Sequence, residues 1–215
     1  MPLDIKNGSS DQKTSMRGRG EFIALIAAIM AINALAVDIM LPGLPQIGAS
    51  LGVQSENHVQ FVITAYLLGF GVSQLFYGPL SDRFGRRLPL FAGLVIYILA
   101  ALGAAIVTDF TTLIILRVLQ GLGAAATRVI AVSVVRDKFA GRQMAEVMSL
   151  VMMVFMILPV VAPATGQLIM LFGEWHLIFL SMAFMAFVIG IWAFLRLPET
   201  LPATNRRPLT VKSVI

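Results

Sequence analysis

Six long apolar runs limit what this chain can fold into. They take up most of its 215 residues and are separated by short polar segments. An α-helix needs about 20 apolar residues to cross the hydrocarbon core of a bilayer. The runs are continuous rather than alternating, and each is about twice as long as a barrel strand, so they predict helices. They cover residues 22–41, 59–77, 88–107, 113–135, 144–172 and 175–195.

Composition agrees with a membrane protein and excludes several kinds of site. Hydrophobic residues make up 58% of the chain and charged residues 13%, whereas soluble domains carry about 25% charged residues. The absence of cysteine excludes disulfides and thiolate metal sites. The two histidines, His58 and His176, are too far apart to match a ligand spacing, and we expect no metal site. No phosphate-binding loop or hydrolase motif occurs, so we expect no enzyme and no cofactor.

Basic residues are confined to alternate polar segments. They fall within 6–19, 83–87, 136–142 and 196–212, while the three intervening loops hold only the acids Glu56, Asp109 and Glu174. This partition predicts that both termini are cytoplasmic. The chain has a high isoelectric point. Because membrane topology explains the basic residues, no nucleic-acid partner is expected. A signal peptide cleaved after Ala36 is a less favoured alternative, because the apolar run continues to Leu41.

The chain divides into a helical bundle between two polar tails. We predict a cytoplasmic tail at 1–20, six transmembrane helices within 21–197, and a cytoplasmic tail at 198–215 that starts a linker. The first three and last three helices would run through the membrane in opposite senses. The predicted fold is therefore an all-α, 3+3 inverted-repeat bundle.

Three ionisable residues lie inside apolar runs, where a charge costs about 2.5–3.5 kcal/mol on the insertion scale. Topology places Asp38 and Arg117 in the outer half of the membrane at compatible depth, so an ion pair between them is one expectation. Arg117, Gly121, Ala124 and Arg128 fall on one helical stripe, with Gln120 beside it. Packing with snorkelling is favoured for Arg128, and a functional role for Arg117.

Two further segments carry unusual residues. In the loop 78–87, turn formation explains Gly78 and Gly85, and topology explains the arginines at 83, 86 and 87, but neither explains Asp82. That carboxylate could pair with its neighbours or cap a helix. In the fifth run, Pro159, Pro163 and Gly166 predict a bend, either static or part of a gate. Asn33, Tyr66 and Gln74 are intramembrane polar residues, and both helix packing and cavity lining are open for them.

Several of these segments together resemble the major facilitator superfamily. Residues 78–87 resemble its signature between helices two and three, and 113–125 resemble the fourth-helix signature of its drug/proton antiporters. Residues 38–45 and 196–201 resemble the bicyclomycin-resistance type of multidrug efflux proteins. Residues 162–167 depart from the fifth-helix signature, because two glycines are missing. The resemblance spans about residues 20–208.

The resemblance implies a proton-coupled multidrug efflux protein of a bacterial-type inner membrane. It implies that Asp38 takes up and releases a proton, that Arg117 tunes it, and that the proton gradient supplies the energy. The implied substrate is a small, amphipathic, drug-like molecule whose identity half a binding site cannot define.

Family members have twelve helices, and this chain has one six-helix half. We therefore expect a truncated or half-length transporter that needs a second half or a second copy of itself. The alternatives are a non-transporting scaffold or assembly subunit and an inactive truncation product.

Overall fold

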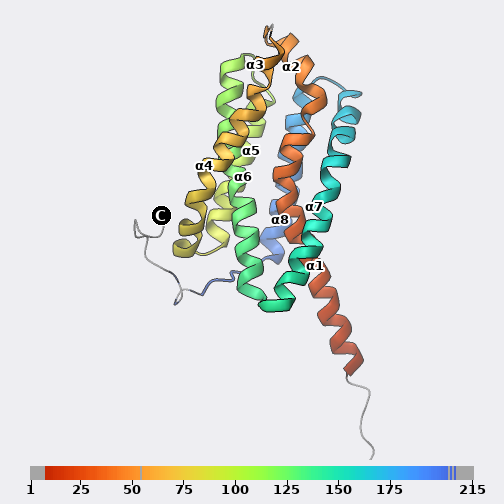
Figure 1. Cartoon of the computed structure of the whole chain (residues 1–215), viewed down its shortest axis with the longest axis vertical. Coiled ribbons are helices and arrows are strands. Elements are labelled where there is room, and N and C mark those ends of the chain that lie inside the picture. Colours follow the sequence, from red (N-terminus) through yellow and green to blue (C-terminus); the bar gives the residue numbers. More distant parts are fainter. Residues whose placement is uncertain (1–7, 54, 203, 205, 207–215) are drawn as a thin grey trace, which may run out of the picture.

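Within the described part of the chain, six apolar helices stand side by side in one bundle, as predicted (Figure 1). The computed structural model describes residues 8–53, 55–202, 204 and 206, and no strand occurs among them. The helical elements are α1 (Gly8–Asp38), the 3-10 helix η1 (Leu41–Gly43), α2 (Leu44–Ser50), α3 (Glu56–Val59), α4 (Phe61–Phe84), α5 (Arg87–Ala104), α6 (Phe110–Lys138), α7 (Gly141–Met170) and α8 (His176–Arg196). The predicted all-α fold class is confirmed.

The first span is longer than its apolar run. The helix α1 begins at Gly8, inside the segment predicted as a tail, and the apolar span continues through η1 and α2 to Ser50. Pro42 lies in the first turn of η1, where a missing backbone N–H costs no hydrogen bond. In the predicted C-terminal tail, residues 203, 205 and 207–215 lie outside the described residues.

The segment 78–87 is mostly helix, so its interpretation as a loop was wrong in extent. Gly78 and Pro79 lie inside α4, which runs on to Phe84. The reversal of the chain is confined to Gly85 and Arg86, and the φ of 88° at Gly85 lies in the region that favours glycine. The signature residues 78–83 therefore extend the second membrane helix.

Close backbone contacts join α6 to α4 and to α5. A Cβ atom at Gly121 would collide with the Tyr66 carbonyl, and one at Gly69 would collide with the backbone of Val118. Between α5 and α6, Gly93 meets Gly123 in the same way. Because lipid gives little hydrophobic drive for association, such small residues allow the van der Waals contact that holds membrane helices together. The helix α1 packs against α7, α6 and α8.

The outer surface of the bundle is apolar. Large side chains are exposed along α7 and α8, among them Met156, Val160, Leu168 and Leu195. In water, such a surface would drive aggregation, whereas a bilayer solvates it. The helix α7 is continuous through Pro159 and Pro163. At the start of α6, the Asp109 carboxylate accepts a hydrogen bond from the Thr112 backbone N–H at 2.8 Å, which lowers the pKa of Asp109.

Candidate functional site

Arg117 is fully buried in the centre of the bundle and donates hydrogen bonds to two neighbouring helices. Its Nη2 donates to the Ala36 carbonyl of α1 at 3.1 Å, and its Nε donates to the Val62 carbonyl of α4 at 3.1 Å. Its Nη1 donates to Oε1 of Gln120, one turn along α6, at 2.8 Å. A single guanidinium therefore fixes the relative positions of α1, α4 and α6.

Aromatic rings enclose the same guanidinium. Its central carbon lies 4.6 Å from the ring centroid of Tyr66 and 5.7 Å from that of Phe179. The Tyr66 hydroxyl donates to Oδ1 of Asn33 at 2.9 Å. Asn33, Tyr66, Arg117 and Gln120 thus form one buried group, which we call the arginine cluster. No sequence pattern singles out Asn33 or Tyr66, because the two residues lie on different helices and only the tertiary structure brings them together.

The expected ion pair between Asp38 and Arg117 is not formed. Asp38 is half-buried, and its carboxylate has neither a hydrogen bond nor an ion pair with any described residue. The reason lies in the end of α1 at Asp38. The last four carbonyls of a helix have no intrahelical partner, so the Ala36 carbonyl is free to accept from Arg117. Asp38 is left two residues away from that contact.

The predicted stripe on α6 is buried over only part of its length. Arg117, Gly121 and Ala124 are buried, whereas Arg128 is exposed. The second polar residue of the signature, Gln120, is fully buried; besides accepting from Arg117, it places Nε2 3.6 Å from the Met182 sulfur of α8.

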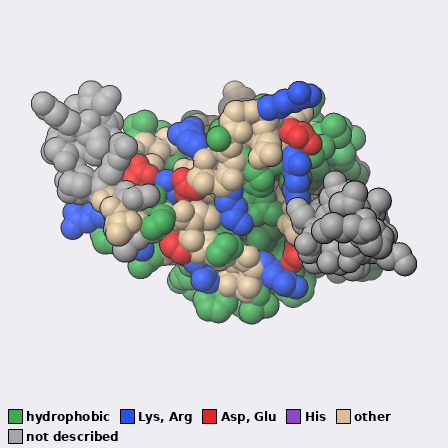
Figure 2. Space-filling model, turned by 90° about the horizontal axis from the view of Figure 1, so that it is seen from below, with side chains coloured by type: hydrophobic (Ala, Val, Ile, Leu, Met, Phe, Trp, Pro, Cys, Tyr) green, Lys and Arg blue, Asp and Glu red, His purple; other side chains and the backbone are tan. Residues whose placement is uncertain are grey.

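A second charged group joins the helix ends at the opposite end of the bundle from α2 and α3. Arg86 is 7% exposed. Its Nε donates to Asp137 at 2.8 Å, and its Nη1 donates to Asp82 at 2.7 Å and to Ser81 at 2.6 Å. Acidic and basic side chains lie interspersed on this face (Figure 2). Asp82 therefore pairs with an arginine of its own signature, one of the two expectations for it.

Glu199, and not Asp82, caps the beginning of α5. Its carboxylate accepts from the backbone N–H of Arg86 at 2.8 Å and of Arg87 at 3.1 Å, at the positive end of α5. Burial alone would raise the pKa of Glu199, but these hydrogen bonds, one from Leu201 and the nearby Arg206 charge outweigh it and lower that pKa. A Cβ atom at Gly85 would collide with this carboxylate.

Two acids that bind Arg86, Asp137 through the arginine side chain and Glu199 through the arginine backbone N–H, were not singled out by sequence reasoning. Asp137 had a usable signal, because it is an acid between Arg136 and Lys138, much as Asp82 is an acid among arginines. Of the other signature residues, Arg87 donates to the Phe194 carbonyl of α8 at 2.9 Å, and Arg83 is exposed.

The fifth-helix residues have a packing role next to Asp38. A Cβ atom at Gly166 would collide with the Ile39 carbonyl and lie against Pro42, so α7 approaches the end of α1 closely there. Pro163 is half-buried and Pro159 is exposed. Gly166 is therefore the residue of the three that lets α7 pack closely against the end of α1.

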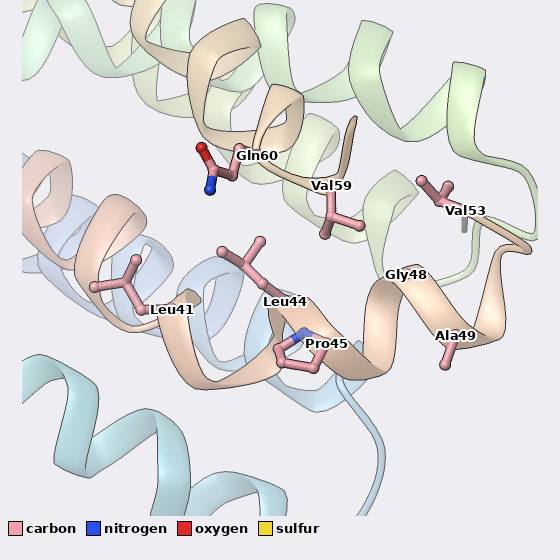
Figure 3. Close-up of a pocket in the computed structure, with 8 residues that line it drawn as sticks. All are labelled: Leu41, Leu44, Pro45, Gly48, Ala49, Val53, Val59 and Gln60. Atoms are coloured by element: carbon pink, nitrogen blue, oxygen red, sulfur yellow. The ribbon is translucent and has the colours of Figure 1, made fainter. Parts of the chain in front are cut away.

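A pocket of about 400 Å³ opens at the end of the bundle that carries α2 and α3 (Figure 3). Leu41, Leu44 and Pro45 lie on one wall, and Gln60 lies on the facing wall at the start of α4. The remaining lining residues are Gly48, Ala49, Val53 and Val59. With one side-chain amide among apolar groups, the pocket suits an apolar moiety. No group of metal-ligating side chains occurs within the described residues.

Comparisons with known proteins agree with this architecture. A family model described as Major Facilitator Superfamily matches residues 26–215. The uncharacterized MFS-type transporter YdgK of Bacillus subtilis is 38% identical, over 87% of this chain and 47% of its own length. A bicyclomycin resistance protein homolog of Haemophilus influenzae is 33% identical, over 90% of this chain and 48% of its own length.

Two further matches give the same coverage. The multidrug resistance protein MdtL of Vibrio parahaemolyticus is 33% identical, over 85% of this chain and 46% of its own length. The crystal structure of the human organic anion transporter MFSD10 (TETRAN) superimposes with a TM-score of 0.68 at 18% identity, over 91% of this chain and 52% of that one, which shows a shared fold. The chain thus spans about half the length of the curated relatives it matches.

Proposed function

Because this chain belongs to the Major Facilitator Superfamily, we propose that it supplies one six-helix unit of a proton-coupled exporter of amphipathic, drug-like molecules. Family membership and the names of its relatives indicate a multi-pass membrane transporter rather than an enzyme. Two of the relatives are named for multidrug and bicyclomycin resistance, which supports efflux as the direction of transport.

The observation that carries the proposal is Asp38, a half-buried acid at the end of α1. Asp38 is the last residue of α1 and lies two residues beyond Ala36, whose carbonyl accepts a hydrogen bond from Arg117. A half-buried acid without a counter-ion among the described residues is suited to bind either a proton or a cationic substrate. Protonated and cation-bound forms would favour different orientations of the two transporter halves.

The proposed substrate class follows from Asp38 together with the pocket at the end of the bundle that carries α2 and α3. The carboxylate supplies a site for positive charge. The pocket, which begins at Leu41 on the same segment, supplies an apolar site of about 400 Å³, within the range of about 300–1,000 Å³ typical of small-molecule sites. A molecule that joins a cationic group to a flat apolar body fits both. No cofactor is needed, because the proton gradient supplies the energy.

The proposed arrangement in the membrane follows from charge. Basic residues gather at the end where the α4–α5 and α6–α7 connections lie, so we place that end and both termini in the cytoplasm of a bacterial-type inner membrane. Alternating access needs two units that rock about a shared site. We propose that a second six-helix half, or a second copy of this chain, completes the transporter.

Ethidium efflux tests the role of Asp38. Cells without pumps of their own would express the chain, and loss of ethidium fluorescence would be followed with and without a proton uncoupler. Wild type is expected to export ethidium only in energised cells, and Asp38→Asn is expected to abolish this export. Asp109→Asn is the matched control, because it neutralises an exposed acid that caps α6 outside the membrane. Full efflux by Asp38→Asn would remove Asp38 from the mechanism.

Wild-type efflux equal to the empty vector would contradict transport by this chain alone. It would favour the alternatives, which are a non-transporting subunit or an inactive truncation product. Detergent-corrected mass of the purified chain then distinguishes the partner, since a second copy predicts twice the mass of 23.3 kDa.

A further inference from the structure

A small pocket with two cationic side chains lies where three helices end. It encloses about 160 Å³ between the beginning of the membrane-spanning part of α1, the last residue of α6 and the last residue of α8. Its lining residues are Gly18, Glu21, Phe22, Leu25, Lys138 and Arg196. We propose that this pocket binds the phosphate headgroup of an anionic phospholipid, a role separate from transport.

The two cations of the pocket have capacity left for a ligand. The Lys138 ammonium lies 4.7 Å from the ring centroid of Phe22 and has no acidic partner among the described residues. Arg196 uses Nε for an ion pair with Glu21 at 3.0 Å, and no other hydrogen bond from it occurs in the described structure. Its two Nη groups are therefore available to a phosphate, which guanidinium groups bind through paired N–H donors.

The floor of the pocket is apolar and fixed. Phe22 packs against Phe139, with ring centroids 5.6 Å apart, and Leu25 is 2% exposed. The adjacent Leu195 is 72% exposed. A rim of cations over an apolar floor matches a ligand that has an anionic head and an apolar body.

The depth of the pocket favours a lipid. Gly18 begins the first membrane span and Arg196 ends the sixth, so the pocket lies at the level of the headgroups. Basic pockets between helices on the cytoplasmic side suit anionic lipids, and the cytoplasmic leaflet carries a negative surface potential. A free phosphate ion shares the anionic group but would make no use of Phe22, Leu25 or Leu195.

Native mass spectrometry of the full chain tests the site. The protein would be released from micelles that contain phosphatidylglycerol or, separately, phosphatidylcholine. Wild type should retain phosphatidylglycerol preferentially. Affinity should fall about five-fold for Lys138→Gln or Arg196→Gln alone and about twenty-five-fold for both, since each variant removes one of the two cations that line the pocket. Glu21→Gln should raise affinity, because it removes the one negative charge of the lining.

The matched control is the double variant Arg136→Gln/Arg142→Gln. It removes two positive charges from the same end of the molecule, and neither arginine lines the pocket. Equal losses in both double variants, or none in Lys138→Gln/Arg196→Gln, would overturn the proposal. Displacement of the lipid by millimolar inorganic phosphate would overturn the lipid as occupant and leave a phosphate site. Retention is measured without transport, so the outcome is independent of the ethidium assay.

Discussion

The backbone N–H of Arg86 donates a hydrogen bond to the Glu199 carboxylate at 2.8 Å, although 113 positions separate the two residues. The contact satisfies a donor at the start of α5 that no intrahelical carbonyl can reach. It also attaches the segment after α8 to the turn at Gly85. Because the same carboxylate accepts from Arg87 and Leu201, removing it releases three backbone donors.

Glu199→Gln is expected to reduce stability in a pH-dependent way. A carboxylate whose pKa is lowered in the folded state contributes stability that is fully present above its unfolded pKa, near 4.5, and is lost as pH falls through the folded value. Thermal unfolding in detergent at pH 7 should show a lower midpoint for Glu199→Gln. The difference from wild type should shrink below about pH 4.5, as the native carboxylate is protonated.

Glu174→Gln serves as the control for that experiment. Glu174 is exposed and lies at the other end of the bundle, where its one charged contact is with His176 at 3.4 Å among the described residues. Its midpoint should follow that of wild type at pH 7 as well as at pH 3. A Glu199→Gln deficit that is the same at pH 7 and pH 3 would contradict the capping role.

Arg86→Gln is expected to cost about 2–3 kcal/mol of unfolding free energy, because Asp82 and Asp137 lose the charge that pairs with both of them. The matched control is Arg83→Gln, an exposed arginine of the same signature, which should change stability by less than about 0.5 kcal/mol. Titration with denaturing detergent measures both variants. Equal effects at the two positions would show that net charge, and not the pairing at Arg86, is responsible.

Tyr66→Phe separates the two contacts that Tyr66 makes in the arginine cluster. The ring stays beneath Arg117, but Oδ1 of Asn33 loses its donor at 2.9 Å. We expect a loss of about 0.5–2 kcal/mol, the range for one hydrogen bond inside a membrane protein. In the double variant with Asn33→Leu, the further loss should be smaller than that of Asn33→Leu in wild type, since the pair is already broken. Strictly additive losses would contradict the hydrogen bond.

Gly69→Ala is expected to disrupt the contact of α4 with α6, because the added methyl group would collide with the backbone of Val118. Overpacking of this kind costs about 1–3 kcal/mol. Gly71→Ala is the control on the same helix, since no atom lies within 4 Å of a Cβ atom built there. It should be neutral or slightly stabilising. Similar losses at both glycines, measured by thermal unfolding in detergent, would show that helix flexibility and not the contact is decisive.

The sequence by itself determined the class of fold and much of the chemistry. Six uninterrupted apolar runs leave few solutions, because a bilayer offers no hydrogen-bond partner to an unsatisfied backbone. The deep position of Arg117 in the fourth run required a polar environment, and the structure provides it in Ala36, Val62 and Gln120. The position of Asp82 among arginines predicted either a charged pair or a helix cap, and Asp82 forms the pair, with Arg86.

Tertiary structure alone decided which atoms meet. Helical spacing fixes the face on which a side chain lies, but not the register of the neighbouring helix or the residue at which it ends. The end of α1 at Asp38 released the Ala36 carbonyl, so Arg117 binds a backbone oxygen in place of the expected carboxylate. Glu199 reached α5 only because the chain after α8 turns back towards it. Both outcomes depend on unpaired backbone groups at helix ends, which the apolar pattern of a sequence does not record.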